Sequence, residues 1–128
     1  MVGDAIAQGG PNNHWTLVGI YPKRKQICYY DSLLMSGDSI CSNLLRYVQD
    51  EYADKKRQEM PNRSSWTIRD IEVPRQRNNY DCGVFVCAYA YCIVTGQDFE
   101  FTEADMPSWR AWIATCIKFC RIPTVRCF

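Results

Sequence analysis

The sequence predicts one α+β domain, and three features carry that prediction. Runs enriched in Trp, Thr, Val and Ile at 15–21 and in apolar and aromatic residues at 26–31 flank a short polar turn, a pattern typical of a β-hairpin. Two later segments, 39–56 and 105–120, place apolar residues at helical spacing. The chain has 128 residues, which suits a single compact core.

The first half of the chain divides into four further pieces. Residues 1–13 carry no periodicity and are expected to be loop or disordered. The amphipathic helix at 39–56 ends in Lys55, Lys56 and Arg57, which suits a C-terminus because the macrodipole favours cations there. A break at 61–65 then leads to a segment, 66–73, that contains a third strand.

The second half of the chain contains an apolar run that could be either a strand or a buried helix. A polar loop at 74–80 leads to Asp81, and residues 82–94 are then apolar on all sides. The run is thirteen residues long and contains two alanines, and Asp81 can serve as its N-cap, so it predicts a buried helix. Gly96 is expected to end that helix.

Composition excludes several classes of function. The chain is 47% hydrophobic and 23% charged, which is ordinary for a globular protein, and its net charge of +1 gives no reason to expect binding to nucleic acid. The longest uncharged stretch, 82–97, is shorter than the roughly 20 residues that a membrane span needs. The N-terminus lacks a basic region followed by an apolar run, so no export signal and no membrane partner are expected.

Eight cysteines raise the question of a disulfide scaffold. Most of them lie in apolar, helix-like runs, where cysteine behaves as a small buried hydrophobe. With one histidine and no Cys-x-x-Cys pair, a zinc site is not expected either. We therefore expect reduced, mostly buried thiols, a location in the nucleus or cytoplasm, and no metal or organic cofactor. Four of the cysteines are expected in the core: Cys87, Cys92, Cys116 and Cys120.

Four residues form a candidate catalytic group: His14, Asp31, Gln76 and Cys82. The two strands of the hairpin would bring His14 and Asp31 together, and a carboxylate there would fix the tautomer of the imidazole. Cys82 would begin the buried helix, where the dipole and nearby amides lower a thiol pKa. Gln76 lies six residues before Cys82, so its amide could face an oxyanion alongside the Cys82 backbone N–H.

Each of these residues also has an ordinary interpretation. A lone cysteine at a helix start is usually structural, and a lone histidine beside a tryptophan usually packs. Asp31 could simply start a turn, and Gln76 could be a solvated loop residue. The joint placement favours the catalytic hypothesis: base and orienting carboxylate on one hairpin, oxyanion donor and nucleophile at one loop–helix junction.

Three segments around these residues resemble the signature blocks of the ubiquitin-like-protease family, which includes the SUMO-specific (sentrin-specific) proteases. They are His14-Trp15-Thr16-Leu17, Tyr30-Asp31-Ser32-Leu33, and the stretch 76–85 with its Asp81-Cys82-Gly83 turn. The order of the blocks and their spacing match, and the resemblance extends over about 14–120. Chain order also separates this sequence from papain proper, in which the cysteine comes first.

The resemblance implies a papain-like α+β fold with a small mixed sheet packed against helices. It also implies that His14 is the general base, Asp31 its orienter, Gln76 an oxyanion donor and Cys82 the nucleophile. Trp15 would line a tunnel for the Gly-Gly tail of SUMO or another ubiquitin-like modifier, although a tryptophan there could also be an ordinary core residue. The implied protein is a monomeric cysteine peptidase that cleaves after that Gly-Gly.

One departure from the family pattern leads to further expectations. Only thirteen residues precede His14, and they contain no hydrophobic strand, so 14–128 is expected to be the C-terminal catalytic part of a domain whose N-terminal subdomain is missing. Trp15 should then be unusually exposed. Two alternatives stay open: an inactive truncated paralogue or partial gene product, and an acyltransferase on a related scaffold.

Overall fold

The computed structural model describes residues 14–122, and within them the expected strands and helices are present. In chain order they are β1 (Leu17–Tyr21), β2 (Gln26–Tyr30), α1 (Asp38–Lys56), the short 3₁₀ helix η1 (Arg63–Ser65), β3 (Thr67–Asp70), α2 (Cys82–Thr95), a second 3₁₀ helix η2 (Glu103–Asp105) and α3 (Met106–Phe119). The prediction of an α+β fold is confirmed. The prediction that 1–13 is loop or disordered lies outside the described residues.

The three strands form one mixed sheet in the order β1-β2-β3. β1 and β2 are antiparallel, with Leu17 opposite Tyr30, and β2 and β3 are parallel, with Ile27 opposite Ile68. The tight turn between β1 and β2 closes through Arg24 N donating to Tyr21 O at 3.0 Å. The hairpin and the small mixed sheet were therefore both predicted correctly.

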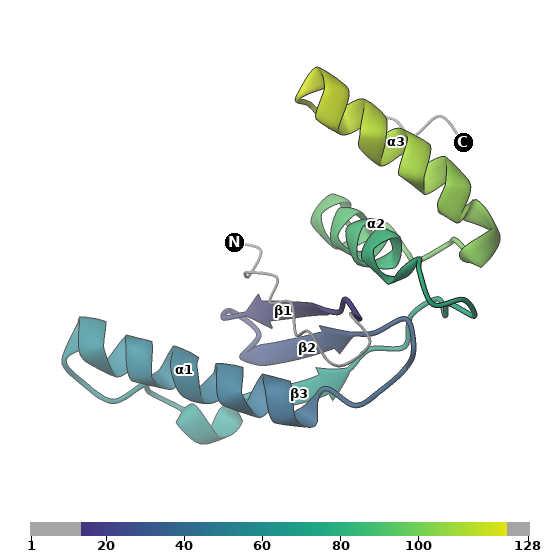
Figure 1. The fold of residues 1–128 in the computed structure, drawn as a ribbon. Helices are drawn as coiled ribbons and strands as arrows, with labels where there is room; N and C mark the ends of the chain where they lie inside the picture. Colours follow the sequence, from purple (N-terminus) through teal and green to yellow (C-terminus); the bar gives the residue numbers. More distant parts are fainter. Residues whose placement is uncertain (1–13, 123–128) are drawn as a thin grey trace.

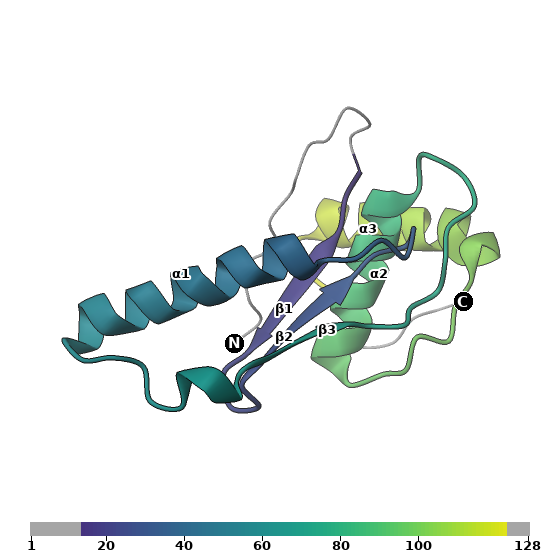
Figure 2. The ribbon, with the colours of Figure 1, turned by 90° about the horizontal axis from the view of Figure 1, so that it is seen from below.

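The sheet lies between helices on its two faces (Figures 1 and 2). α1 covers one face, α2 covers the other, and α3 packs on the far side of α2. Successive side chains of a strand point to opposite faces. Leu17 and Tyr30 accordingly join the core on the α2 side, whereas Val18 and Ile27 join the core on the α1 side.

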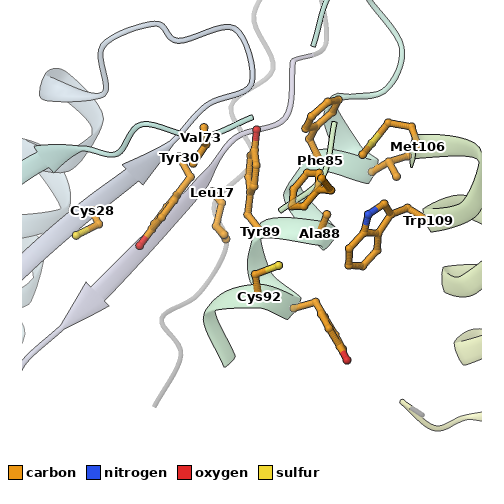
Figure 3. Close-up of a cluster of buried hydrophobic side chains, with 13 residues drawn as sticks. Leu17, Cys28, Tyr30, Val73, Phe85, Ala88, Tyr89, Cys92, Met106 and Trp109 are labelled. Atoms are coloured by element: carbon orange, nitrogen blue, oxygen red, sulfur yellow. The ribbon is translucent and has the colours of Figure 1, made fainter. Parts of the chain in front are cut away.

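The core on the α2 side is largely aromatic (Figure 3). Tyr89 is fully buried on α2 between the sheet and Phe101, whose ring centroid is 5.9 Å from its own. The Tyr89 hydroxyl donates to the Pro74 carbonyl at 2.5 Å, which ties α2 to the loop ahead of it. From α3, Trp109 is 1% exposed and meets Tyr91 edge to face at 5.7 Å. Aromatic side chains therefore pack against α2 both on the side that faces the sheet and on the side that faces α3.

The expectation that the helix at 82–94 is buried on all sides is wrong for one side of α2. Cys87 and Val94 are exposed, because the sheet and α3 cover two sides of α2 and leave a stripe between them. On α3, Cys120 is exposed and Cys116 only half-buried, so the expectation that they lie in the core is wrong as well, while Cys92 is in the core as expected. None of the seven described cysteines is disulfide-bonded, and four of them are buried.

Gly96 ends α2 as predicted. It adopts φ 68°, a left-handed conformation that suits glycine, and its N–H reaches back to the Cys92 and Ile93 carbonyls. No helix within residues 14–122 is long and apolar enough to cross a membrane.

Candidate active site

His14 and Asp31 meet at the open end of the hairpin. His14 lies just before β1 and Asp31 just after β2, so the antiparallel pairing places them side by side. The distance from His14 Nε2 to Asp31 Oδ1 is 2.6 Å, and the two side chains are 14% and 1% exposed. With Nε2 against the carboxylate, Nδ1 is the ring nitrogen left to exchange a proton with another group.

The loop after β2 wraps its backbone around the Asp31 carboxylate. Leu33 N donates to Oδ1 at 2.8 Å and Met35 N donates to Oδ2 at 3.2 Å. This wrapping places Leu34 at φ 57°, a left-handed conformation that costs a branched residue free energy. Asp31 therefore starts a turn, as its ordinary interpretation proposed, and also binds the imidazole.

Gln76 lies in the loop before α2 and is 2% exposed, so its interpretation as a solvated residue is wrong. Its Oε1 accepts from the Ser32 hydroxyl at 2.6 Å, and its Nε2 donates to the Asn78 carbonyl at 2.8 Å. Ser32 directly follows Asp31, so the loop that orients His14 is also bonded to Gln76.

Cys82 is the first residue of α2 and is 6% exposed. The N–H groups of the first helical turn have no intrahelical acceptor, and the helix dipole is positive at this end, so N–H donors surround the Cys82 position. Asp81 precedes it as the N-cap residue, but its side chain makes no capping hydrogen bond. Its backbone carbonyl accepts instead, from Val84 N at 2.9 Å and Phe85 N at 3.0 Å.

The Asp81 side chain fails to cap α2 because it has stronger partners elsewhere. Arg110 of α3 binds Oδ1 through Nη2 at 2.6 Å and Nε at 3.1 Å, and Asn78 Nδ2 donates to Oδ2 at 2.7 Å. Arg110 also donates to the Tyr80 carbonyl at 3.0 Å. α3 is thereby fastened to the turn that precedes Cys82.

A groove of about 460 Å³ runs beside Cys82 between α2 and α3. Trp15, Gly83 and Ile117 contribute to its wall. Trp15 is 50% exposed, in agreement with the expectation that it is unusually exposed. Cys87, although exposed as a residue, lines the same groove, and partial burial of its sulfur raises the pKa of that thiol. Cys82 and Cys87 therefore both line this groove.

Three residues that matter for this geometry carried no prediction: Ser32, Asn78 and Arg110. Asn78 has a local signal, since Asn favours turns in which its side chain accepts backbone N–H bonds, here from Tyr80 at 3.1 Å and Asp81 at 3.0 Å. Ser32 and Arg110 have none, because their partners lie 44 and 29 residues away in the chain.

His14 is held by a buried carboxylate, and the next residue, Trp15, shares a groove with Cys82 at the N-terminus of α2. An imidazole and a cysteine of this kind can support thiol-dependent nucleophilic chemistry when they approach each other. No group of three or more His, Cys, Asp or Glu side chains that could hold a metal ion occurs within residues 14–122.

Comparison with known proteins gives the family. Residues 7–121 match the Ulp1 protease family, C-terminal catalytic domain, and the chain belongs to that family. Sentrin-specific protease 2 of Homo sapiens is 39% identical over 100 residues, which cover 76% of this chain and 17% of the relative. A sentrin-specific protease of Caenorhabditis elegans is 37% identical over 98 residues, covering 76% of this chain and 14% of that protein.

Solved structures agree. The catalytic domain of the Chaetomium thermophilum Ulp1-like SUMO protease superposes with a TM-score of 0.76 and 28% identity over 96% of this chain and 47% of that one. The C-terminal Ulp1 protease domain in complex with Smt3, the yeast ortholog of SUMO, superposes with a TM-score of 0.65 and 28% identity. The match covers 81% of this chain and 46% of that one. The fold is that of the Ulp1 catalytic domain. The chain spans about half the length of these solved domains and under a fifth of the curated relatives.

Proposed function

We propose that this chain carries the catalytic centre of a cysteine peptidase that hydrolyses the bond after the C-terminal Gly-Gly of SUMO or a related modifier. The observation that carries the proposal is the 2.6 Å contact of His14 with the buried Asp31 carboxylate, next to Trp15, which shares a groove with the cysteine that begins α2. Membership of the Ulp1 family and likeness to a domain solved with Smt3 support SUMO as the modifier.

The first half of the reaction forms an acyl-enzyme. His14 Nδ1 takes the Cys82 thiol proton, and the sulfur attacks the carbonyl carbon of the terminal glycine. The carbonyl π electrons move to oxygen, and Gln76 Nε2 and the Cys82 backbone N–H donate to that oxyanion. The C–N bond then breaks as the oxyanion re-forms the carbonyl, and the imidazolium gives its proton to the departing amine.

The second half releases the modifier. His14 takes a proton from water, and the hydroxide oxygen attacks the thioester carbon. The C–S bond breaks, the glycine carboxylic acid is formed, and the proton returns to the Cys82 sulfur. Throughout both halves Asp31 stabilises the imidazolium and fixes which ring nitrogen reacts.

Trp15 is proposed to select the Gly-Gly tail. It stands over Gly83, where an added Cβ would lie 3.9 Å from its ring, so it flanks the start of α2. A narrow passage beside an aromatic side chain admits glycine and excludes residues with larger side chains, so steric exclusion at Trp15 would set specificity. A location in the nucleus or cytoplasm fits the seven described cysteines, none of which is disulfide-bonded.

A covalent probe tests the proposal directly. SUMO ending in a Gly-vinyl sulfone should alkylate Cys82 of the purified chain, and Cys82→Ala should abolish labelling. His14→Ala should slow it by about 10²–10⁴-fold, the usual range for a missing base. Cys120→Ser, which removes an exposed thiol on the far end of α3, is the matched control and should label normally.

The same experiment separates the alternatives. Wild-type protein that stays unlabelled would identify an inactive remnant and contradict the proposal. Transfer of an acetyl group from acetyl-CoA to a lysine substrate, with no reaction with the SUMO probe, would identify an acyltransferase instead.

A further inference from the structure

Two loops that carry different parts of the site are joined by a pair of hydrogen bonds between buried residues. Gln76 N donates to the Ser32 carbonyl at 3.0 Å, and the Ser32 hydroxyl donates to Gln76 Oε1 at 2.6 Å. Ser32 is 1% exposed and Gln76 2% exposed. In such a water-poor setting a lost hydrogen bond leaves a polar atom unsatisfied, so these contacts hold the loops in one arrangement.

The side-chain bonds also decide which end of the Gln76 amide points where. A glutamine amide has an accepting oxygen and a donating nitrogen of nearly the same shape, and a half-turn exchanges them. The Asn78 carbonyl can only accept, so it selects Nε2 at 2.8 Å, and the Ser32 hydroxyl then donates to Oε1. Nε2 carries two N–H groups, of which this contact uses one.

We propose that Ser32 is a positioning residue that holds the Gln76 amide in the orientation that donates its second N–H to the oxyanion. This proposal rests on the proposed function, since it deepens the role assigned to Gln76. Because Ser32 directly follows Asp31, one turn orients both the base and the oxyanion donor. Without the hydroxyl, Oε1 is left buried and unbonded, and the amide rotates toward other partners.

A pair of small reagents separates oxyanion stabilisation from thiol activation. The Cys82 sulfur adds to the aldehyde carbon of acetyl-Gly-glycinal, and the former carbonyl oxygen then occupies the oxyanion position. Iodoacetamide alkylates the same sulfur with loss of iodide and forms no oxyanion. Ser32→Ala should weaken aldehyde binding about 10-fold, part of the 10²–10³ that a whole oxyanion donor supplies. Its iodoacetamide rate at Cys82 should stay within about twofold of wild type.

The control variant lies on the same loop. Ser36 is exposed and its hydroxyl accepts a hydrogen bond from the nearby Asp38 N–H at 3.3 Å, so Ser36→Ala should leave both reactions unchanged. In a Gln76→Ala background, Ser32→Ala should have no additional effect on aldehyde binding, because its action runs through Gln76. NMR of the Gln76 side-chain amide should show loss of order in Ser32→Ala.

Each outcome has a definite meaning. Equal loss of both reactions would show a general structural role and overturn the inference, as would an additive effect in the Gln76→Ala background. Unchanged aldehyde binding in Ser32→Ala would overturn this inference alone. Wild-type Cys82 no more reactive than a free thiol would overturn the proposed function itself. If Ser32→Ala does not fold, Ser32→Thr and Ser32→Val, which differ only by the hydroxyl, give the same comparison.

Discussion

The two faces of the sheet differ in what they support. On the α1 face, Val18, Ile27, Tyr29 and Cys41 form a small apolar core. On the α2 face a larger aromatic core holds the helix that begins with Cys82, and α3 adds Arg110 to the turn before it. Both cores stabilise the fold, but the candidate nucleophile and its anchor depend on one of them.

This difference has a structural cause. The sheet itself contributes His14 and Asp31 from the ends of its strands, and these need only the hairpin. Cys82 has to be brought to them by packing across the α2 face, over contacts between parts of the chain that are far apart. The α1 face therefore acts on stability, whereas the α2 face acts on stability and on the site together.

The largest expected effect comes from removing Trp109, the ring by which α3 joins the core on the α2 side. Trp109→Ala should lower the free energy of unfolding by about 3–5 kcal/mol, because the ring is 1% exposed and packs edge to face on Tyr91 and Trp112. Cys82 should also react more slowly with the SUMO probe at a temperature where the variant is folded. Urea unfolding and probe kinetics measure the two effects.

The matched variant is on the other face. Ile27→Ala, at 0% exposed, should cost about 2–5 kcal/mol and leave the reactivity of Cys82 in the folded protein close to wild type. Equal losses of reactivity in the two variants would show that the faces do not differ in the way described.

The next effect compares two glycines. A Cβ on Gly37 would overlap the ring of the buried Tyr29, so Gly37→Ala should destabilise the α1 face by roughly 1–3 kcal/mol through overpacking. A Cβ on Gly83 would meet only Trp15 at an ordinary 3.9 Å, so Gly83→Ala should change stability little. Thermal unfolding would contradict this account if Gly83→Ala were the more destabilised variant.

The elements were predictable from sequence because local chemistry specifies them. Periodicity located α1 and α3, and Gly96 marked the end of α2. The pairing of His14 with Asp31 followed from a hairpin, which is a local structure. What depended on distant contacts was missed: the partner of Asp81 is on α3, and the exposure of Cys87 depends on how α3 lies against α2.

A smaller effect is expected from removing the contact between Arg110 of α3 and Asp81. Arg110→Ala removes both bonds to an Asp81 carboxylate that is 7% exposed, and should cost about 1–2 kcal/mol, discounted because the arginine is half exposed. The probe should also react more slowly with Cys82. On the α1 side, Lys55→Ala removes an exposed pair with Glu51 and should leave the unfolding midpoint unchanged. A measurable loss in Lys55→Ala matching that of Arg110→Ala would contradict the comparison.

The smallest expected effect is a loss of stability in alkali that comes from the α1 face. Burial raises the pKa of the Cys41 thiol to about 11 from 9.0, with Asp70 adding to the shift. The folded state thus keeps this proton more tightly than the unfolded state, so the stabilisation is complete below pH 9 and is lost as pH rises toward 11. Between pH 8 and 10 the thiol should remove on the order of 1 kcal/mol from the free energy of unfolding.

Urea unfolding at the two pH values should therefore show a smaller pH-dependent loss in Cys41→Ala than in wild type. Cys120→Ser, an exposed thiol, should keep the wild-type loss, and an identical loss in all three proteins would show that Cys41 does not contribute.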